Sequence, residues 1–420
     1  MLAVMRDKDL YATILGIRSP WRVVTVDLSP QSEEVCVTIE AEPGVRFDCP
    51  SCGKPCSRYD SRRRSWRHLD TCQFKTLLVA DVPRVECTEH GVVQAHVPWA
   101  EPGSGLTALM EALIIDWLKE AGIQAVARQL RLGWDQIDGV MQRAVARGLK
   151  RRAFGPLARL CIDETSFQKR HEYVTIVTDP ATSSVVYVAD GRNAAALEGF
   201  WNSLTPAQLA AIEVVAMDMS QAYIRSTIDH VPDAKSKIAF DRFHVARAIN
   251  DAVNTVRKQE HRALSAEHYP ILKGTRSVWI TNPENHNETQ DTLFRFLKDL
   301  GLKVARAFAI KETARGLWSY KTRGWALRGW KQWISWAMRS RLEPIKKVAR
   351  MVRDHLWGIL NAVVLKATNA ISESVNAKVQ WIKYTACGFR NRERFRNAIY
   401  FHCGDLDLYP ATLRATHTTS

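Results

Sequence analysis

The stretch Leu157-Ala-Arg-Leu-Cys-Ile-Asp-Glu-Thr-Ser-Phe167 decides the fold expected of this 420-residue chain. Its apolar part predicts a buried strand, Leu157–Ile162, which ends at the acidic pair Asp163-Glu164. Two more apolar, β-branched runs follow at Tyr173–Thr178 and Val185–Ala189. Because only turn residues separate these runs, we expect three consecutive strands to begin a domain.

Helices and strands alternate after these three strands. The sequence predicts a helix at Ala194–Leu204, a strand at Glu213–Met217, a helix at Gln221–Asp229 and a strand at Lys237–Phe240. Three strands followed by alternating helices and strands predict an α/β core with a mixed sheet. RNase H-like folds have the same order of elements.

The chain beyond this core is expected to be helical. Residues 245–367 contain no convincing strand, and 14 Lys and Arg stand against three acidic residues between positions 301 and 360. Five tryptophans, at positions 318, 325, 330, 333 and 336, have two interpretations: core packing, which we favour, or stacking of an indole on a splayed DNA base. A last helix is predicted at Ala370–Lys383, capped by Asn369, with Glu373 and Asn376 away from its apolar stripe.

A cysteine- and arginine-rich module covers residues 44–98. Cys49-Pro-Ser-Cys52 and Cys87-Thr-Glu-His90, each followed by glycine, can together hold one tetrahedral zinc ion. Zinc would replace a hydrophobic core that so short a segment cannot build. The alternative is a set of unpaired buried thiols, and the spare thiols Cys56 and Cys72 could substitute in the ligand set.

Two basic segments suit the backbone of DNA. One is the arginine-rich stretch between the zinc ligands, and the other is a helix-turn-helix around the break Arg131–Trp134. Its first helix is Ile123–Leu130, and its second runs from Asp135 to about Arg147. A separate helix, capped by Thr107 and ended by Gly122, precedes them. A solvated charge run and an ordinary helical hairpin are the alternatives. The side chains expected at DNA are Arg62, Arg63, Arg64, Arg67, Arg143 and Arg147.

Composition favours a soluble protein with a polyanionic partner. The 59 Lys and Arg against 44 Asp and Glu give a net charge of +15, which favours a polyanionic partner such as nucleic acid. On charge alone, a merely basic soluble protein is an equal alternative. The N-terminus carries charges too early for a secretory signal, and no apolar run reaches membrane-spanning length. Nine cysteines, an odd number, fit a reducing cytoplasm better than an extracellular disulfide framework. We therefore expect a cytoplasmic protein associated with the nucleoid.

Three carboxylates carry the expected chemistry. Asp163 and Asp218 each follow an apolar strand and Glu373 lies near a helix start, so folding can unite them across separations of 55 and 155 residues. Two Mg²⁺ ions held about 3.5–4 Å apart activate the attacking oxygen and stabilise the leaving oxygen in phosphoryl transfer. Magnesium prefers such hard oxygen ligands. Taken alone, each acid is more commonly a cap or turn former.

Several motifs together resemble the ISL-three family of insertion-sequence transposases and, more distantly, Mutator-like transposases. They follow in order over almost the whole chain: Cys49–Gly53, Arg64–Asp70, Ile162–Phe167, Tyr173–Val177, Asp218–Ser220 with Tyr223, Asp241–His244 and Gly388–Asn391. The resemblance implies an RNase H-like core, interrupted by a helical insertion, in which Asp163, Asp218 and Glu373 hold Mg²⁺ or Mn²⁺.

The resemblance also assigns the neighbours of the second acid. Asp241 and His244 match the acid-x-x-His signature of such enzymes, and in an alternative assignment Asp241 is itself the second acid. His244 would contact the scissile phosphate or the DNA, unless it is a structural histidine. The chain departs from the family pattern at His90, where a cysteine is common, and beside Glu373, where relatives often have glycine.

The expected architecture is a multidomain α+β protein, and the expected function is DNA transposition. Such an enzyme would bind the terminal inverted repeats of an insertion sequence, cut them with metal ions and transfer the strands, as a homodimer or higher oligomer on DNA. The alternative is a catalytically silent, transposase-derived DNA-binding protein or repressor. The expected domains are a β-rich segment with a zinc ribbon (1–98), a helix-turn-helix (105–150), the first part of the RNase H-like core (155–244), an all-helical insertion (245–367) and the C-terminal part of the core (368–408).

Overall fold

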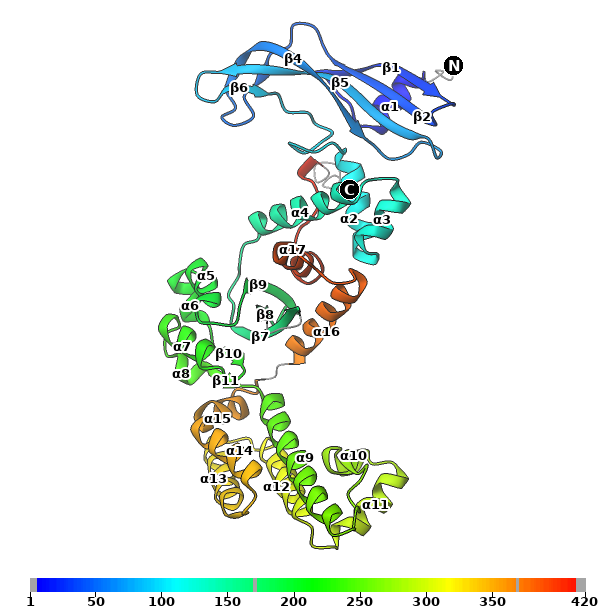
Figure 1. The fold of residues 1–420 in the computed structure, drawn as a ribbon. Coiled ribbons are helices and arrows are strands. Elements are labelled where there is room, and N and C mark those ends of the chain that lie inside the picture. The colour runs from blue at the N-terminus through cyan, green and yellow to red at the C-terminus, as the bar shows by residue number, and fades with distance from the viewer. Residues whose placement is uncertain (1–5, 169–171, 368–369, 413–420) are drawn as a thin grey trace, which may run out of the picture. The chain divides into compact units, whose positions relative to one another are not determined.

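A computed structural model describes residues 6–168, 172–367 and 370–412 (Figure 1). The chain forms two compact units, Met1–Arg152 with Leu406–Ser420, and Ala153–Asp405. The expected zinc ribbon and helix-turn-helix lie in the first unit, and the expected core and insertion lie in the second. Within the described ranges, no helix is long and apolar enough to cross a membrane.

The first unit begins with a six-stranded sheet whose strands lie in the order β1-β2-β5-β4-β3, with β6 paired to β5. Trp66 on β4 packs with Leu78, Ala80 and Val82 on β5 in the core, and these three alternate with more exposed residues as the period of a strand requires. The elements are α1 (Asp7–Ile14), β1 (Trp21–Ser29), β2 (Glu34–Ala41), β3 (Phe47–Asp48), β4 (Pro55–Arg67), β5 (Lys75–Cys87) and β6 (Gly91–Gln94).

Three helices follow the sheet: α2 (Ala108–Glu120), α3 (Ile123–Leu130) and α4 (Trp134–Arg151). The Thr107 side chain accepts a hydrogen bond from the backbone N–H of Met110, which confirms the predicted N-cap of α2. Arg131 ends α3 in the left-handed region at φ +54°, and Gly133 precedes α4. The chain therefore makes the tight turn between α3 and α4 that the sequence predicts.

A five-stranded mixed sheet lies at the centre of the second unit, as expected. Its order is β11-β10-β7-β8-β9: β7 pairs antiparallel with β8 and parallel with β10, β8 pairs antiparallel with β9, and β10 pairs parallel with β11. The strands are β7 (Arg159–Gln168), β8 (Glu172–Asp179), β9 (Ser184–Asp190), β10 (Val214–Met217) and β11 (Ile238–Phe240).

One strand boundary was predicted wrongly. The first strand of this sheet does not end at Ile162, because β7 continues to Gln168. Its pairing with β8 runs on through Asp163↔Ile176 and Ser166↔Tyr173, and these ladder hydrogen bonds hold the polar residues in the strand. Asp163 therefore lies in the middle of a strand and not at its end.

Helices cover both sides of this sheet (Figure 1), with α5 to α8 on one side and α16 and α17 on the other. The core between the sheet and α5 to α8 is apolar and includes Ile162, Val177, Phe200, Met217 and Phe240. The covering helices are α5 (Ala195–Ser203), α6 (Pro206–Ala211), α7 (Gln221–His230), α8 (Ala234–Lys237), α16 (Ala370–Thr385) and α17 (Arg392–Cys403). Asn369, the predicted cap of α16, lies outside the described residues.

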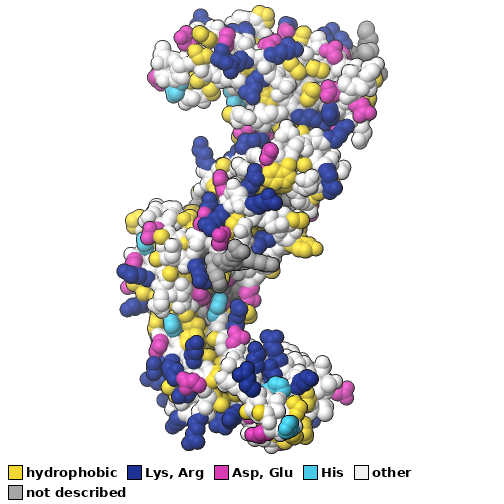
Figure 2. All heavy atoms as spheres, in the orientation of Figure 1, with side chains coloured by type: hydrophobic (Ala, Val, Ile, Leu, Met, Phe, Trp, Pro, Cys, Tyr) yellow, Lys and Arg dark blue, Asp and Glu magenta, His cyan; other side chains and the backbone are white. Residues whose placement is uncertain are grey.

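The segment expected to be an insertion contains helices and no strand in its described part, as predicted. It comprises α9 (Arg242–Ala266), α10 (Arg276–Ile280), the short 3₁₀ helix η1 (Pro283–Asn285), α11 (Glu288–Lys298), α12 (Lys303–Leu317), α13 (Arg323–Arg339), α14 (Glu343–Asp354) and α15 (Leu356–Val364). Figure 2 shows Lys and Arg side chains gathered on the surface of this part of the chain.

The tryptophans of the insertion divide between core and surface. Trp330 and Trp333 are buried and pack edge to face, which confirms core packing for these two. Trp325 is 59% exposed, and the Arg328 guanidinium lies over its ring at 4.8 Å. Stacking of a DNA base on a tryptophan of this group stays a prediction.

Candidate active site and zinc site

Three aspartates meet at one level of the second unit's sheet. The parallel register pairs Ala216 with Cys161 and Met217 with Phe240. Continued to the next residues, this register sets Asp218 level with Asp163 on one side and with Asp241 on the other. The backbone hydrogen bond from Asp241 to the Met217 carbonyl, at 2.9 Å, begins this continuation. Adjacent parallel strands therefore bring together acids that are far apart in sequence.

Each aspartate accepts hydrogen bonds from its own neighbourhood. The Asp241 side chain caps α9 by accepting from the Phe243 N–H at 2.9 Å, and it accepts from His244 Nδ1, also at 2.9 Å. Asp218 accepts from the backbone N–H of Ser220 at 2.9 Å. Asp241 is thus a cap and a partner of His244, as the acid-x-x-His spacing suggests, and it is also a member of the acidic cluster.

The cluster is short of positive charge. Burial raises the pKa of Asp163 and of Asp218 above the ordinary value, and the negative charge of Asp241 adds to both shifts. The pKa of His244 is raised by its hydrogen bond to Asp241 and then by the charges of Asp241, Asp218 and Asp163. A bound cation would relieve this repulsion, and oxygen donors suit a hard divalent cation such as Mg²⁺.

Helix α16 lies against this cluster, although the predicted third acid itself is exposed. Asn376 donates from Nδ2 to Asp163 Oδ2 at 2.8 Å, and Ser372 is buried beside Thr178 of β8. Glu373 follows Ser372 directly and faces solvent. The structure thus unites Asp163, Asp218, Asp241 and His244 and places Glu373 one helical turn before a residue that touches Asp163. The contact of Asn376 was not predicted, although its position on the Glu373 side of the helix was.

The four predicted zinc ligands converge at one point of the first unit. Donor atoms of Cys49, Cys52, Cys87 and His90 all lie within 4.8 Å of one another. The Cys52 and Cys87 sulfurs are 3.7 Å apart, and His90 Nδ1 lies 3.6 Å from the Cys87 sulfur. Four donors about 2.0–2.3 Å from a tetrahedral zinc lie roughly 3.5–3.8 Å from one another, so these residues fit zinc.

The surroundings of these thiols also fit a metal site. Hydrogen bonds from the Glu89 backbone and from His90 lower the pKa of Cys87 to about 6, which favours the thiolate that binds metal. In the described part of the chain, no other group of three or more Cys, His, Asp or Glu side chains converges as closely. The donor atoms of the acidic cluster around Asp163 are therefore farther apart than those of the zinc ligands. Cys56, whose thiol donates to the Lys54 carbonyl, and the exposed Cys72 lie outside the ligand set.

The arginines of β4 differ in their surroundings. Arg62 and Arg63 are exposed, and Arg63 forms an ion pair with Asp81 at 3.6 Å. Arg64 is partly buried; its guanidinium donates to Gln94 and lies over the Trp66 ring. Arg67 is buried and bonded to Asp70 and to the His68 carbonyl.

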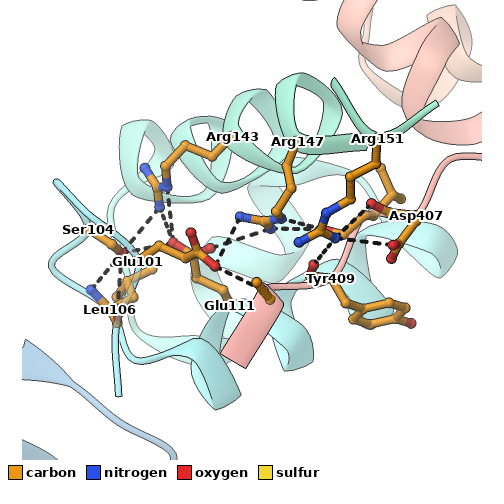
Figure 3. A network of polar contacts seen from close by, with 11 residues as sticks. Glu101, Ser104, Leu106, Glu111, Arg143, Arg147, Arg151, Asp407 and Tyr409 are labelled. Carbon is orange, nitrogen blue, oxygen red and sulfur yellow. Dashed lines mark hydrogen bonds and ion pairs between the residues drawn. The ribbon is translucent and has the colours of Figure 1, made fainter. Parts of the chain in front are cut away.

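The arginines of α4 point into a polar network within the first unit (Figure 3). Glu111 on α2 is fully buried, and its carboxylate accepts from Arg143 at 2.5 Å and lies 3.8 Å from Arg147. Arg147 also donates to the Leu408 carbonyl at 2.7 Å, and Arg151 donates to the Tyr409 carbonyl at 2.7 Å. The guanidinium groups of Arg143 and Arg147 therefore have an internal use, and their contact with DNA stays a prediction.

We expect Arg147→Ala to destabilise the helices of the first unit by about 3 kcal/mol. The change leaves the buried Glu111 carboxylate less compensated, because breaking a buried ion pair costs far more than losing an exposed one. Hydrogen exchange of the α2 and α4 amides measures the opening free energy of this region separately from the second unit. The control is Lys150→Ala, at an exposed position of the same helix, and the double variant Arg147→Ala/Glu111→Gln should recover part of the loss. Equal effects of Arg147→Ala and Lys150→Ala would contradict a structural role for Arg147.

The same regions match known transposases in chain order. A family model described as a zinc finger of the IS204/IS1001/IS1096/IS1165 transposases matches residues 46–90, and a helix-turn-helix model of transposase family ISL3 matches residues 95–145. A model of ISL3 transposases, described as "Transposase", matches residues 160–399. Since that match covers more than half of the chain, the chain belongs to the ISL3 family of transposases, the ISL-three family named above.

Relatives of known name agree with this placement. The transposase for insertion sequence element IS1557 of Mycobacterium tuberculosis is 28% identical, over 92% of this chain and 93% of the relative. The transposase for insertion sequence element IS1001 of Bordetella parapertussis is 25% identical, over 83% of this chain and 86% of the relative. The zinc-finger match together with the convergence of three cysteines and a histidine indicates a structural zinc ion, and the helix-turn-helix match indicates DNA binding.

Proposed function

We propose that this transposase is a DDE enzyme in which Asp163, Asp218 and Glu373 hold two Mg²⁺ or Mn²⁺ ions. The observation that carries the proposal is the level placement of aspartates on adjacent strands with α16 bonded to one of them. The strand order β9-β8-β7-β10-β11, with β7 central and three parallel strands, supports an RNase H-like core. In that interpretation, α9 to α15 are an insertion between the second and third acids.

The residues of the cluster have separate tasks in this proposal. Bound metal would activate a water oxygen for attack on the phosphodiester and stabilise the leaving 3′-oxygen. Asp218, whose carboxylate accepts from one backbone N–H, is assigned to the metal, whereas Asp241 holds His244. His244, whose raised pKa favours the protonated ring, is assigned to the negative charge of the scissile phosphate.

The reaction proceeds in two displacements at phosphorus. Water attacks a phosphodiester at the element's end, and the bond to the 3′-oxygen breaks to give a 3′-hydroxyl. That hydroxyl then attacks a phosphodiester of target DNA and expels a 3′-oxygen there, so no covalent protein–DNA intermediate is formed. The zinc ribbon and the helix-turn-helix would recognise the terminal inverted repeats. Because two ends are joined, we propose a homodimer or higher oligomer on DNA.

The test is cleavage of labelled DNA that carries the element's own ends. With Mg²⁺ or Mn²⁺ we expect cuts at the end of the element, and none when the divalent ion is omitted from zinc-loaded protein. Tight, end-specific binding without metal-dependent cutting would instead favour the catalytically silent DNA-binding protein. Omitting Mg²⁺ is preferable to adding a chelator, because a chelator also removes zinc.

We propose that β4 contributes phosphate contacts through Arg62, Arg63 and Arg64, while Arg67 is assigned to the fold. We expect Arg62→Ala to weaken binding to all DNA sequences alike and to reduce the slope of log K against log salt by about 1, because one phosphate contact is lost. Fluorescence anisotropy over a series of KCl concentrations measures this slope. The control is Arg22→Ala, which removes an exposed arginine, paired with Glu40, from another strand of the same sheet. An unchanged slope in Arg62→Ala would remove Arg62 from the DNA interface.

A further inference from the structure

One face of α16 is bonded to β7 at three successive points. Asn376 donates to the Asp163 carboxylate at 2.8 Å, Gln380 Nε2 to the Thr165 hydroxyl at 3.0 Å, and Lys383 Nζ to the Ser166 carbonyl at 2.8 Å. The donors are spaced four and three residues apart, so they lie on one face of the helix. These bonds join α16 to β7 along the length of the helix.

The apolar stripe of α16 supports the same placement. Val375, Val379 and Ile382 are buried, whereas Glu373 and Ser374 face solvent. A buried stripe sets how the helix is rotated, but apolar contacts tolerate sliding along a strand more readily than directional hydrogen bonds do. The polar contact that fixes the turn of α16 carrying Glu373 is therefore the one through Asn376, three residues away.

Two N–H donors define the plane of the Asp163 carboxylate. Asn376 bonds Oδ2, and the backbone N–H of Glu164 bonds Oδ1 at 2.8 Å. Each carboxylate oxygen has a further lone pair, so both bonds are compatible with metal binding. The Asn376 amide is neutral, so it orients the carboxylate without the positive charge by which a lysine would compete with a cation.

We propose that Asn376 is a positioning residue of the metal site, which orients the Asp163 carboxylate and sets the turn of α16 that carries Glu373. This role rests on the proposed function, because it concerns the same metal ions. Groups that orient metal ligands typically contribute 10–100-fold to metal affinity or activity. Since Asn376 touches the proposed metal ligand Asp163, its loss should act on metal affinity first and on cleavage through it.

The test measures Mn²⁺ binding to zinc-loaded, full-length protein without DNA by isothermal titration calorimetry. We expect Asn376→Ala to weaken Mn²⁺ binding about 10–100-fold. We also expect high Mn²⁺ to restore much of its cleavage of end DNA. Gln380→Ala is the matched control, because it removes a bond from the same helix face to the same strand without touching a carboxylate. It should bind Mn²⁺ within about twofold of the wild type.

The outcomes separate the role of Asn376 from the proposed function. Wild-type affinity in Asn376→Ala, or an equal loss in Gln380→Ala, would overturn the positioning role and leave the metal site intact. Asn376→Leu, whose side chain has a similar shape without a hydrogen-bond donor, must show the same weakening of Mn²⁺ binding. It replaces Asn376→Ala as the test variant if the alanine variant folds poorly. A wild type whose Mn²⁺ binding is absent, or is unaffected by Asp163→Asn, would overturn the proposed function and the positioning role together.

Discussion

Asp218→Asn lowers metal-dependent cleavage of end DNA at least about 10³-fold, with DNA binding retained. The reason is electrostatic, because a neutral amide cannot balance the positive charge of a divalent ion. A metal ion stabilises the transition state by several kcal/mol. A loss of about 4 kcal/mol of this stabilisation corresponds to a 10³-fold lower cleavage rate. The measurement is single-turnover cleavage of labelled ends in Mg²⁺, together with anisotropy to establish binding. We expect the same of Asp163→Asn, because both aspartates lie at one level of adjacent strands.

Asp241→Asn is the informative comparison. It keeps an oxygen to cap α9 but weakens the bond to His244, so a smaller loss, about 10–100-fold, is expected. Retained cutting by Asp218→Asn with complete loss in Asp241→Asn would transfer the role of second acid to Asp241. That result would keep the DDE proposal and change its ligand set.

Asp218→Asn should also be more heat-stable than the wild type when no divalent ion is present. The pKa of Asp218 is raised in the folded state. The folded protein therefore binds the proton of this carboxyl more tightly than the unfolded chain does, which stabilises the fold at low pH. This stabilisation is lost as the pH rises from the unfolded-state pKa through the raised folded-state pKa. At a pH above the raised pKa the wild type carries the cost of the ionised, repelled carboxylate, whereas asparagine carries none. Thermal unfolding with and without Mg²⁺ tests this, and a lower melting temperature for metal-free Asp218→Asn would contradict it.

Cys49→Ser prevents zinc binding and unfolds the ribbon, the second large effect that we expect. Structural zinc contributes about 10–16 kcal/mol to the folding of zinc-finger peptides, and Cys49, Cys56, Val85 and Cys87 form only a small buried cluster beside the site. The expected result is a zinc content that falls from one ion per chain to none, with loss of hydrogen-exchange protection in β3, in β6 and at the ends of β4 and β5 beside the zinc site. Binding to the ends should weaken, because Arg62 and its neighbours lie on β4, between the two pairs of zinc ligands.

The controls for zinc use the thiols outside the ligand set. Cys72→Ser removes an exposed thiol and should keep both zinc and protection, while Cys56→Ser tests a buried thiol next to the ligands. Full zinc content in Cys49→Ser would show that another donor completes the site. Zinc loss in Cys56→Ser but not in Cys49→Ser would move Cys56 into the ligand set.

Features encoded by neighbouring residues were predictable from the sequence. The zinc ligands lie in two short motifs, Cys49–Cys52 and Cys87–His90, whose spacing brings each pair of donors to one side of a turn. The Thr107 cap, the strands of the mixed sheet and the helices between β11 and α16 follow likewise from local periodicity and capping. The physical reason is that such patterns reflect hydrogen bonding and burial within one element.

Contacts between distant segments were decided by the tertiary structure alone. Strand pairing with β8 extended β7 past Asp163, and the docking of α16 bonded Asn376 to Asp163 across 213 residues. Burial of Glu111 turned the α4 arginines inward, although their sequence equally suits a surface that binds DNA. A residue's charge and helix position are local properties. The group that forms an ion pair with that residue depends on which distant side chain is buried beside it, and tertiary packing determines this.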